Sequence, residues 1–224
     1  WAQQRGLPRI IGHQAGVDRL KDVMKDCSEL GIHMVSAYVL STENWKRPED
    51  EINSLMELIR TKGKDLAKEL HRLNVKINFI GSTDNLSEDV IKIINEVTEL
   101  TKNNTKYVAN MVFNYGGRRE ITQAIQKVVA SGINPDDVTE ELLSQHMYTK
   151  GIPDPDLVIR SAGENRISNF LIWQTANSVF YSSEVLWPDF GRQQLVEAIK
   201  AYSDSMKNMA SSDNYYVENN FPED

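Results

Sequence analysis

Cysteine is almost absent from this sequence, with Cys27 as the one thiol in 224 residues. A single cysteine excludes an intrachain disulfide and suits a reducing compartment. Cys27 falls on the apolar side of a predicted helix, so we expect a buried, inert thiol rather than a nucleophile. No apolar run approaches the ~20 residues that cross a membrane, and no signal peptide is visible. We therefore expect a soluble chain, located in the cytoplasm or, in a plant, in the plastid stroma.

Positive charge is also in short supply. Lysine and arginine number 25 against 32 aspartates and glutamates, which gives a net charge of −7 and a pI near 5.2. This balance argues against a broad nucleic-acid-binding face, so we expect no nucleic-acid partner, and any anion site must be a local cluster of basic residues. The histidines lie apart, without metal-ligand spacing. Glycine-rich nucleotide loops and the nucleophile elbow of hydrolases are missing as well.

Apolar stretches of strand length alternate with longer segments of helical periodicity. The predicted strands are residues 33–40, 75–80, 107–114, 157–159 and 179–181. This alternation predicts one α/β domain over residues 1–209, with a mostly parallel central sheet and helices on both faces. The first helix is expected to begin after Gly16 and the last to end near Met209. The acidic remainder, residues 210–224, is expected to be poorly ordered.

Polar clusters follow three of these strands, at residues 41–47, 114–119 and 160–168. The carboxyl ends of parallel strands meet at one edge of a sheet, where ligands bind in open α/β folds. We therefore expect the three clusters to lie together at a single rim. Each cluster alone is a weak signal, and their convergence is what indicates a binding site.

The third cluster carries two arginines, Arg160 and Arg166, and a helix is predicted to begin just after Ser168. Guanidinium forks and the free N–H groups of a helix start would together make a cradle for a diphosphate. The alternative is that the two arginines only form salt bridges with Glu164 and Asp156.

Five longer blocks place these clusters in a wider pattern. They read GLPRIIGHQAG, STENWKRP, FNYGGRREI, DPDLVIRSAGENRISNFLIWQ and EVLWPDF. The blocks resemble the signature blocks of the cis-prenyltransferases, the family that includes undecaprenyl diphosphate synthase. They occur in the family's order and span the chain from Trp1 to about Phe190, so the match is highly specific.

The resemblance implies a reaction in which an allylic diphosphate ionises, the alkene of isopentenyl diphosphate attacks, and a proton is lost. By resemblance, the isopentenyl diphosphate is held by Arg160, Arg166 and Ser168, and the allylic diphosphate by Arg9 and His13. Asn44 would lie at the reaction centre, and because an amide is a poor base it is expected to orient or relay rather than accept the proton. The other residues implied to contact substrate are Trp1, Ser41, Thr42, Glu43, Trp45 and Arg47, most of them in a mobile loop. The implied partners are isoprenoid diphosphates and a second copy of the chain, with membrane contact only for a long product.

Structural roles remain open for several of these residues. Trp45 would simply pack on the helix that follows it, His13 would act only as a cap at the start of a helix, and Glu43 would be a plain surface charge. Arg118 and Arg119 are expected to stabilise the rim or a dimer rather than to contact substrate.

Two departures from the family pattern concern magnesium, the cofactor that the resemblance implies. The family's catalytic aspartate and its first strand belong to a block that would precede Trp1, so we expect both upstream of residue 1. The family's second metal ligand, a glutamate, aligns with Val179, and valine cannot ligate a metal. Glu184 is the nearest acid downstream. This sequence therefore supplies no predicted metal ligand of its own.

The valine also bears on the product. Its presence favours a specialised relative that makes a short product or joins two allylic units irregularly, as lavandulyl-type synthases do. The alternatives are a housekeeping long-chain synthase of the undecaprenyl type and a non-catalytic partner subunit. An intact set of Arg160, Arg166 and Ser168 argues against the last of these.

Overall fold

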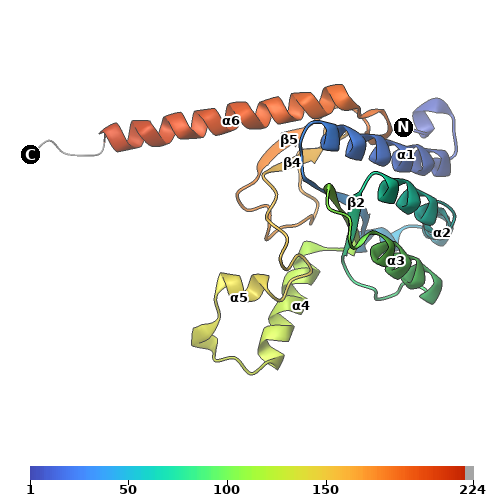
Figure 1. The fold of residues 1–224 in the computed structure, drawn as a ribbon, viewed down its shortest axis with the longest axis horizontal. Helices are drawn as coiled ribbons and strands as arrows, with labels where there is room; N and C mark the ends of the chain where they lie inside the picture. Colours follow the sequence, from blue (N-terminus) through green and yellow to red (C-terminus); the bar gives the residue numbers. More distant parts are fainter. Residues whose placement is uncertain (220–224) are drawn as a thin grey trace, which may run out of the picture.

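The computed structural model describes residues 1–219, and side chains as far as Met209. Its strands are β1 (Met34–Ser41), β2 (Val75–Ile80), β3 (Tyr107–Tyr115), β4 (Leu157–Arg160) and β5 (Val179–Ser182). The helices are α1 (Arg9–Glu29), α2 (Glu49–Arg72), α3 (Glu88–Thr101), α4 (Gly117–Ala130), α5 (Glu140–Ser144) and α6 (Arg192–Asn219), with short 3₁₀ helices η1 (Gln3–Arg5), η2 (Thr42–Lys46), η3 (Pro135–Asp137) and η4 (Trp187–Asp189). The predicted α/β architecture is confirmed, and each predicted strand is found to within one residue at each end (Figure 1).

All strand pairs are parallel, as predicted, but they form two sheets where one was expected. β1, β3 and β2 make a three-stranded sheet with β3 in the middle, and β4 pairs with β5 alone. Among residues 1–219 no hydrogen-bonded ladder joins β1 to β4, so the expected central sheet is divided between these two strands. The first strand that the resemblance places upstream of residue 1 stays a prediction.

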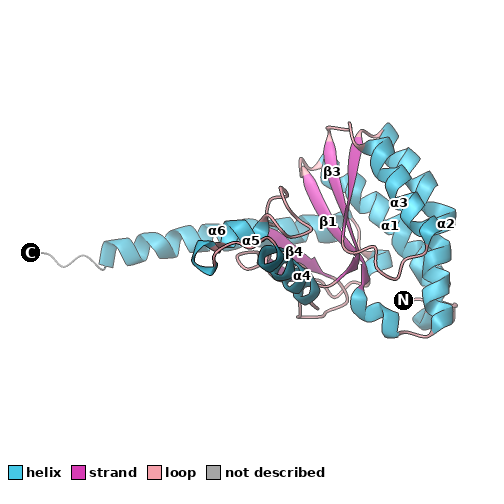
Figure 2. Ribbon diagram, turned by 90° about the horizontal axis from the view of Figure 1, so that it is seen from below, coloured by secondary structure: helices cyan, strands magenta, loops and turns pink. Residues whose placement is uncertain are grey.

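Helices α1, α2 and α3 cover one face of the three-stranded sheet (Figure 2). Their apolar sides supply Met24, Leu70 and Val97, which pack on Met111 of β3. These side chains are almost completely buried, and burial of a large apolar side chain stabilises the fold by roughly 1.5–3 kcal/mol. α6 contributes Leu195 to the same core, and the partly buried Ile159 of β4 packs against it, so both sheets share one hydrophobic centre.

The opposite face of the sheet carries a row of polar side chains across its three strands and is covered by a segment without regular secondary structure. Asn110, which is fully buried in β3, accepts a hydrogen bond from Asn78 at 3.0 Å and donates one to Ser36 at 3.1 Å, so its amide is satisfied on both sides. Near the carboxyl ends of the strands this face is covered by the segment after β4, where Phe170 stacks on Tyr38 of β1 with ring centroids 4.7 Å apart.

Cys27 lies in α1 and is only 2% exposed. Burial raises the pKa of its thiol to about 11, so the nucleophilic thiolate is not formed near neutral pH. The prediction of a buried, inert thiol is confirmed.

Helix α1 begins at Arg9, whereas the sequence pattern predicted a helix that begins only after Gly16. The helix therefore starts seven residues before Gly16. Pro8 precedes it with φ −58°, close to the helical value that its ring imposes. The glycines inside α1 allow close packing rather than ending the helix. A Cβ at Gly12 would lie 3.2 Å from Ala2 Cβ, and one at Gly16 would lie 3.3 Å from a ring carbon of Trp187.

The helix predicted after Ser168 is wrong, because residues 170–177 form turns. Ser168, Asn169 and Leu171 all have positive φ, between 43° and 62°, which a right-handed helix excludes. Leu171 is 2% exposed and belongs to the cluster on the second face of the sheet, so burial of this side chain stabilises the turn. No helix N-terminus is therefore available at Ser168 for a diphosphate.

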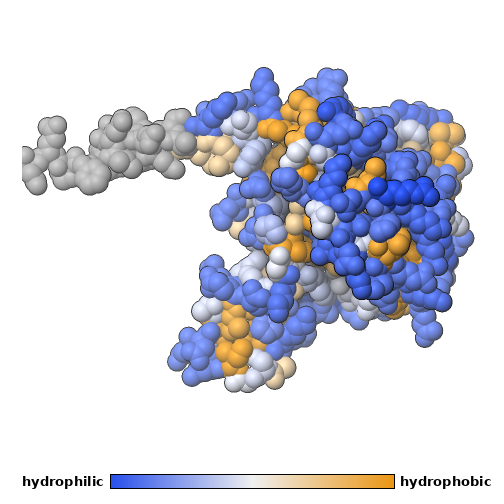
Figure 3. All heavy atoms as spheres, viewed as in Figure 1, coloured by the Kyte–Doolittle hydropathy of each residue, from blue (hydrophilic) through white to orange (hydrophobic). Residues whose placement is uncertain are grey.

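Two elements extend away from the body of the molecule in Figure 1. One is the α4–α5 arm, residues 117–144, whose exposed apolar side chains include Ile125, Val129 and Val138 and whose surface has an apolar patch in Figure 3. The other is α6, which continues ten residues past the predicted end at Met209 because no glycine or proline interrupts it before Asn219. Residues 220–224 of the predicted tail lie outside the described residues. No helix in the described part is long and apolar enough to span a bilayer.

Candidate functional site

The loop that follows β1 is folded into η2 by its own side chains. Ser41 Oγ accepts a hydrogen bond from the Glu43 backbone N–H at 3.1 Å, and Asn44 Oδ1 accepts one from the Ser41 backbone N–H at 2.9 Å. This reciprocal arrangement is a capping box, which satisfies two backbone donors at once. The carbonyl oxygen of Asn44 is thus occupied in holding the loop. A role for Asn44 in the reaction stays a prediction.

Trp45 lies on the inner side of the same loop. Its indole N–H donates to Asn114 Oδ1 at 2.7 Å, and its ring packs on a cluster that contains Ile52 and Met56 of α2. The alternative role, packing on the helix that follows the loop, is therefore what the structure shows. Contact between Trp45 and substrate stays a prediction.

Glu43 is more than a surface charge. Its carboxylate accepts hydrogen bonds from Ser41 Oγ at 2.6 Å, from Thr42 Oγ1 at 3.3 Å and from Asn169 Nδ2 at 2.7 Å. Burial alone would raise the pKa of Glu43, but these hydrogen bonds and one from its own backbone outweigh burial, so the pKa lies below its usual value. The side chain is held ionised and in a fixed orientation.

A first cationic cluster surrounds Glu51, in the first turn of α2, and we call it the Glu51 cluster. Glu51 accepts from Arg9 at 2.9 Å and from Arg47 at 2.8 Å, and His13 Nε2 lies 3.8 Å from the same carboxylate. Only 11% of the Glu51 side chain is exposed, whereas Arg9 is 62% exposed. The predicted ligands of the allylic diphosphate are therefore brought together, next to the predicted mobile loop.

His13 does not cap a helix, since it is the fifth residue of α1 and the helix start has no side-chain cap. Its pKa is lowered, first by burial and then by Arg47 and Arg9, against the opposing effect of Glu51. Its Nε2 is buried and has no hydrogen-bond partner among the described residues. A buried polar atom without a partner is costly, so a ligand that formed a hydrogen bond with this nitrogen would remove that cost.

A second cationic cluster surrounds Glu164, and we call it the Glu164 cluster. Its carboxylate pairs with Arg160 and, at 3.0 Å, with Arg166. Arg166 Nε also donates to Ser168 Oγ at 3.2 Å. The salt bridges that the alternative expects are present with Glu164, whereas Asp156 pairs with neither arginine in the described structure. Binding of a diphosphate by Arg160, Arg166 and Ser168 stays a prediction. The hydrogen bond from Arg160 lowers the pKa of Glu164, and the nearby arginine charges lower it further, so this carboxylate is ionised at neutral pH.

Contacts at the start of α4 connect the three polar clusters. The Asn169 backbone carbonyl accepts from the Gly117 N–H at 2.8 Å, and its side-chain carbonyl accepts from the Arg118 N–H at 2.9 Å. Its amide donates to Glu43, as described above. The expectation that the clusters after β1, β3 and β4 lie together is confirmed. The sequence interpretation missed Asn169, although its place directly after Ser168 in the SNF segment was a signal.

Two other predicted positions have structural contacts. The Trp1 indole N–H donates to Asp189 Oδ1 at 2.8 Å, and the Arg5 guanidinium lies over the Trp1 ring, 4.3 Å from its centre. These contacts hold the first residues of the chain against η4. Arg119 pairs with Asp84 in the loop after β2, in agreement with a role in stabilising the rim. Substrate contact by Trp1 stays a prediction.

The described residues do not make a protein-ligated magnesium site. No three histidine, cysteine, aspartate or glutamate side chains gather within residues 1–209 as a metal site requires. Val179 pairs with Leu157 at the amino ends of β5 and β4, three residues and therefore about 10 Å along the strand from the Arg160 end. The carboxylate of Glu184 lies against Gly163, the residue directly before Glu164, where an added Cβ would collide with it.

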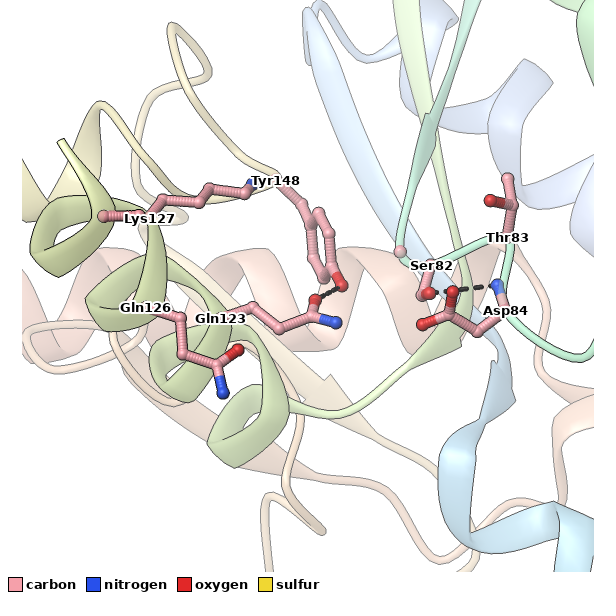
Figure 4. Close-up of a pocket in the computed structure, with 9 residues that line it drawn as sticks. Ser82, Thr83, Asp84, Gln123, Gln126, Lys127 and Tyr148 are labelled. Atoms are coloured by element: carbon pink, nitrogen blue, oxygen red, sulfur yellow. Dashed lines mark hydrogen bonds between the residues drawn. The ribbon is translucent and has the colours of Figure 1, made fainter.

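Two cavities, of about 470 and 400 Å³, lie away from these clusters. The larger is lined by side chains such as Asp84, Gln123 and Lys127, and Tyr148 forms a hydrogen bond with Gln123 across it (Figure 4). None of the predicted substrate-binding residues lines either cavity. Neither cavity therefore belongs to the predicted substrate-binding site.

Comparison with known proteins identifies the family of this chain. Residues 1–210 match the family described as putative undecaprenyl diphosphate synthase. The chain is 46% identical over 206 residues to an isoprenyl transferase of Clostridium perfringens, covering 90% of this chain and 81% of that protein. It is also 46% identical over 211 residues to an isoprenyl transferase of Streptococcus pneumoniae, covering 91% and 84%.

Solved structures give the same result. Lavandulyl diphosphate synthase from Lavandula x intermedia, in complex with dimethylallyl diphosphate, has a TM-score of 0.86 and 34% identity, covering 90% of this chain and 89% of that one. A probable undecaprenyl diphosphate synthase from Campylobacter jejuni has a TM-score of 0.76 and 32% identity, covering 85% and 89%. The chain is an enzyme of the prenyltransferase class. It belongs to the cis-prenyltransferase (undecaprenyl diphosphate synthase) family.

Proposed function

We propose that this enzyme condenses isopentenyl diphosphate with an allylic diphosphate, releases diphosphate and forms a longer prenyl diphosphate. The observation that carries the proposal is the presence of two arginine pairs, in the Glu51 and Glu164 clusters, joined through η2 and Asn169. Two diphosphate substrates need two cationic holders that sit close enough for their carbon ends to react.

Each cluster has a distinct role in the proposed reaction. Arg9 and His13 hold the allylic diphosphate, whose negative charge grows as its C–O bond breaks, so cationic and N–H donors stabilise the leaving group. Arg160, Arg166 and Ser168 hold the isopentenyl diphosphate while its alkene forms the new C–C bond. The other loop residues, Ser41, Thr42, Glu43, Trp45 and Arg47, and Trp1 close around the substrates, and Asn44 orients the group that receives the proton.

The regular, chain-extending reaction is the better-supported product class. The relatives that are 46% identical carry the name isoprenyl transferase without an irregular product. Irregular coupling of two dimethylallyl units is a second candidate, supported by Val179 in place of the family glutamate and by the likeness to lavandulyl diphosphate synthase. The chain length of the product is part of the same proposal, and a housekeeping long-chain synthase is its simplest form.

Radiolabelled isopentenyl diphosphate, incubated with dimethylallyl or longer allylic starters, tests the proposal. Products resolved by length are expected to contain the label and to grow in five-carbon steps. In a second incubation, with radiolabelled dimethylallyl diphosphate as the only substrate, labelled product would establish the irregular reaction instead. Absence of labelled product in both incubations would refute the enzymatic proposal and favour a non-catalytic partner subunit.

We also propose that turnover depends on Mg²⁺ and that this ion is held mainly by diphosphate oxygens and water. Magnesium retains several waters and needs few protein ligands, which fits a site where the described residues offer no donor set. Loss of activity with EDTA and recovery with Mg²⁺ are expected. Full activity in EDTA would refute the requirement.

A homodimer is proposed through the α4–α5 arm. Ile125 and Val129 lie one helical turn apart on α4 and are 48% and 73% exposed, and Val138, which follows η3 in the same arm, is exposed as well. An apolar stripe of this kind commonly marks an interface. Light scattering should give twice the chain mass for the wild type, and Val129→Lys should shift the molecule toward monomer. A wild-type monomer would overturn this assignment. The cytoplasmic or stromal location stays a prediction.

A further inference from the structure

We infer that Asn169 is a positioning residue that couples the loop after β1 to the Glu164 cluster, so that the two proposed diphosphate holders keep a fixed relative orientation. The inference rests on the proposed function and extends it to a residue that contacts neither arginine pair directly. Asn169 follows Ser168 immediately in the chain and reaches Glu43 across 126 residues of sequence.

Asn169 makes three hydrogen bonds that link α4 to the loop after β1. Its two carbonyl oxygens, backbone and side chain, accept the first N–H groups of α4, from Gly117 and Arg118, at 2.8 and 2.9 Å. These N–H groups have no partner within the helix, so Asn169 acts as a cap supplied from a distant loop. The side-chain NH2 group of Asn169 donates one hydrogen bond to Glu43 Oε1 at 2.7 Å. The donor at Arg118 and the acceptor at Glu43 together fix which way the amide points.

The backbone around Asn169 is shaped for this contact. Its φ is +62°, a region that asparagine tolerates better than most residues. A Cβ at Gly116 would lie 2.6 Å from Thr42 Oγ1 and 3.0 Å from Asn169 Nδ2, and one at Gly117 would lie 3.1 Å from the Asn169 carbonyl oxygen. The two glycines therefore let three chain segments approach more closely than side chains would permit.

The segment beyond Asn169 is anchored independently in the core. Gln174 donates to the buried Glu120 at 3.0 Å, and Glu120 also accepts from the Tyr115 hydroxyl at 2.6 Å and from the Tyr148 N–H at 2.9 Å. Because this end is fixed, we expect a displacement of Asn169 to alter the positions of Ser168 and the arginines of the Glu164 cluster. It should also alter the position of Glu43.

Asn169→Asp is the decisive variant, because aspartate keeps both acceptors for α4 and replaces only the donor to Glu43 by a second carboxylate. We expect kcat/KM to fall about tenfold to a hundredfold, from loss of a hydrogen bond to a charged group and from like-charge repulsion. The acidic limb of the pH–rate profile should move to higher pH, since two adjacent carboxylates share a proton.

The chain offers a matched control in Asn74. Its φ is +59°, its Oδ1 accepts the Thr105 N–H at 3.0 Å and its Nδ2 donates to Thr105 Oγ1 at 3.3 Å, at the amino end of β2. Asn74→Asp therefore repeats the same chemical change far from the rim. Its kinetic constants and pH profile should match those of the wild type, whatever its effect on Tm.

A rescue experiment separates positioning from a structural defect. Glu43→Gln in the Asn169→Asp background restores a hydrogen bond of reversed polarity, from the Gln amide to the Asp carboxylate. We expect the double variant to lose less activity than the two single losses multiplied together. Multiplicative losses, or an Asn169→Asp enzyme that behaves like Asn74→Asp, would overturn the inference.

The proposed function and the role of Asn169 are tested by two different measurements. Turnover by the wild type decides whether the chain is a prenyltransferase in solution, whereas the ratio of variant to wild type decides the role of Asn169. If the wild type does not turn over, titration with inorganic pyrophosphate by calorimetry makes the same comparison. Asn169→Asp should then bind pyrophosphate more weakly than Asn74→Asp, and equal affinities would again refute the role of Asn169.

Discussion

The Glu51 and Glu164 clusters have the same chemical plan but differ in how the chain builds them. In each, one carboxylate lies between two arginines. The Glu51 cluster joins residues from α1, from the loop after β1 and from α2, around a carboxylate that is 11% exposed. The Glu164 cluster is local, with Arg160 and Arg166 only four and two residues away and a carboxylate that is 36% exposed.

This difference separates a cluster that contributes to the fold from one that is free to exchange partners. An ion pair between distant segments holds those segments together, and a shielded carboxylate is costly to leave unpaired. An exposed local pair contributes little to stability, because water replaces it easily. We therefore expect a diphosphate to displace Glu164 from its arginines at small cost, whereas Glu51 should keep Arg47 in place while a ligand engages the exposed Arg9.

Arg160→Ala should produce the largest effect. Removal of a charge-assisted hydrogen-bond donor to a diphosphate should raise the KM for isopentenyl diphosphate about tenfold to a hundredfold. The KM for the allylic substrate should change little, because the Glu51 cluster is intact. Steady-state kinetics with each substrate varied in turn gives both values. Arg160→Lys should fall between, since lysine lacks the planar fork.

Arg192 provides the control for this prediction. It also lies between two carboxylates, Asp26 at 2.9 Å and Glu29 at 2.8 Å, but at the start of α6. Arg192→Ala should leave both KM values as they are. If Arg160→Ala alters both substrates equally, the assignment of separate holders is wrong.

Glu51→Gln and Glu164→Gln should show the next largest contrast, this time in stability. Glu51→Gln removes the shared anion of a shielded cluster, and the free energy of unfolding should fall by about 1–2 kcal/mol, measured by urea denaturation. Glu164→Gln should leave the free energy of unfolding almost unchanged, and the KM for isopentenyl diphosphate should not rise. Equal destabilisation by the two substitutions would remove the distinction drawn between the clusters.

The sequence was sufficient for the features set by local pattern. Alternation of apolar runs gave all five strands, and the placement of Arg160 at the end of β4 followed from the short run before it. The meeting of three polar clusters at one rim followed from parallel strands alone. The family resemblance, stated for Trp1 to about Phe190, is confirmed by the family match over residues 1–210.

Features set by tertiary contacts could not be predicted in the same way. The helix expected after Ser168 fails because burial of Leu171 and the capping of α4 by Asn169 hold positive φ values there, and neither contact is visible in a local pattern. The early start of α1 depends on close packing of Gly12 and Gly16 against other segments. The division of the sheet between β1 and β4 likewise depends on which strands pair, which periodicity does not specify.

The smallest predicted effect is a pH dependence of stability that belongs to the Glu51 cluster. His13 faces Glu51, Arg47 and Arg9, and its pKa in the folded state is lowered from 6.5, chiefly by burial. The Glu164 cluster, with Arg160 and Arg166, contains no histidine. Only the Glu51 cluster should therefore make the free energy of unfolding depend on pH just below neutrality.

The sign follows from proton binding. Below pH 6.5 the unfolded chain takes up a proton at His13 before the folded protein does, so the free energy of unfolding falls as the pH falls toward the folded-state pKa. Above pH 6.5 both states are neutral at this residue and nothing is lost. Urea denaturation between pH 7.5 and about 5.5 should show a shallower decline for His13→Gln than for the wild type. The exposed His33, replaced in the same way, should leave the wild-type decline intact. If His13→Gln shows the same decline as the wild type, folding does not lower the pKa of His13. The contrast in stability between the two clusters would then depend on Glu51 alone.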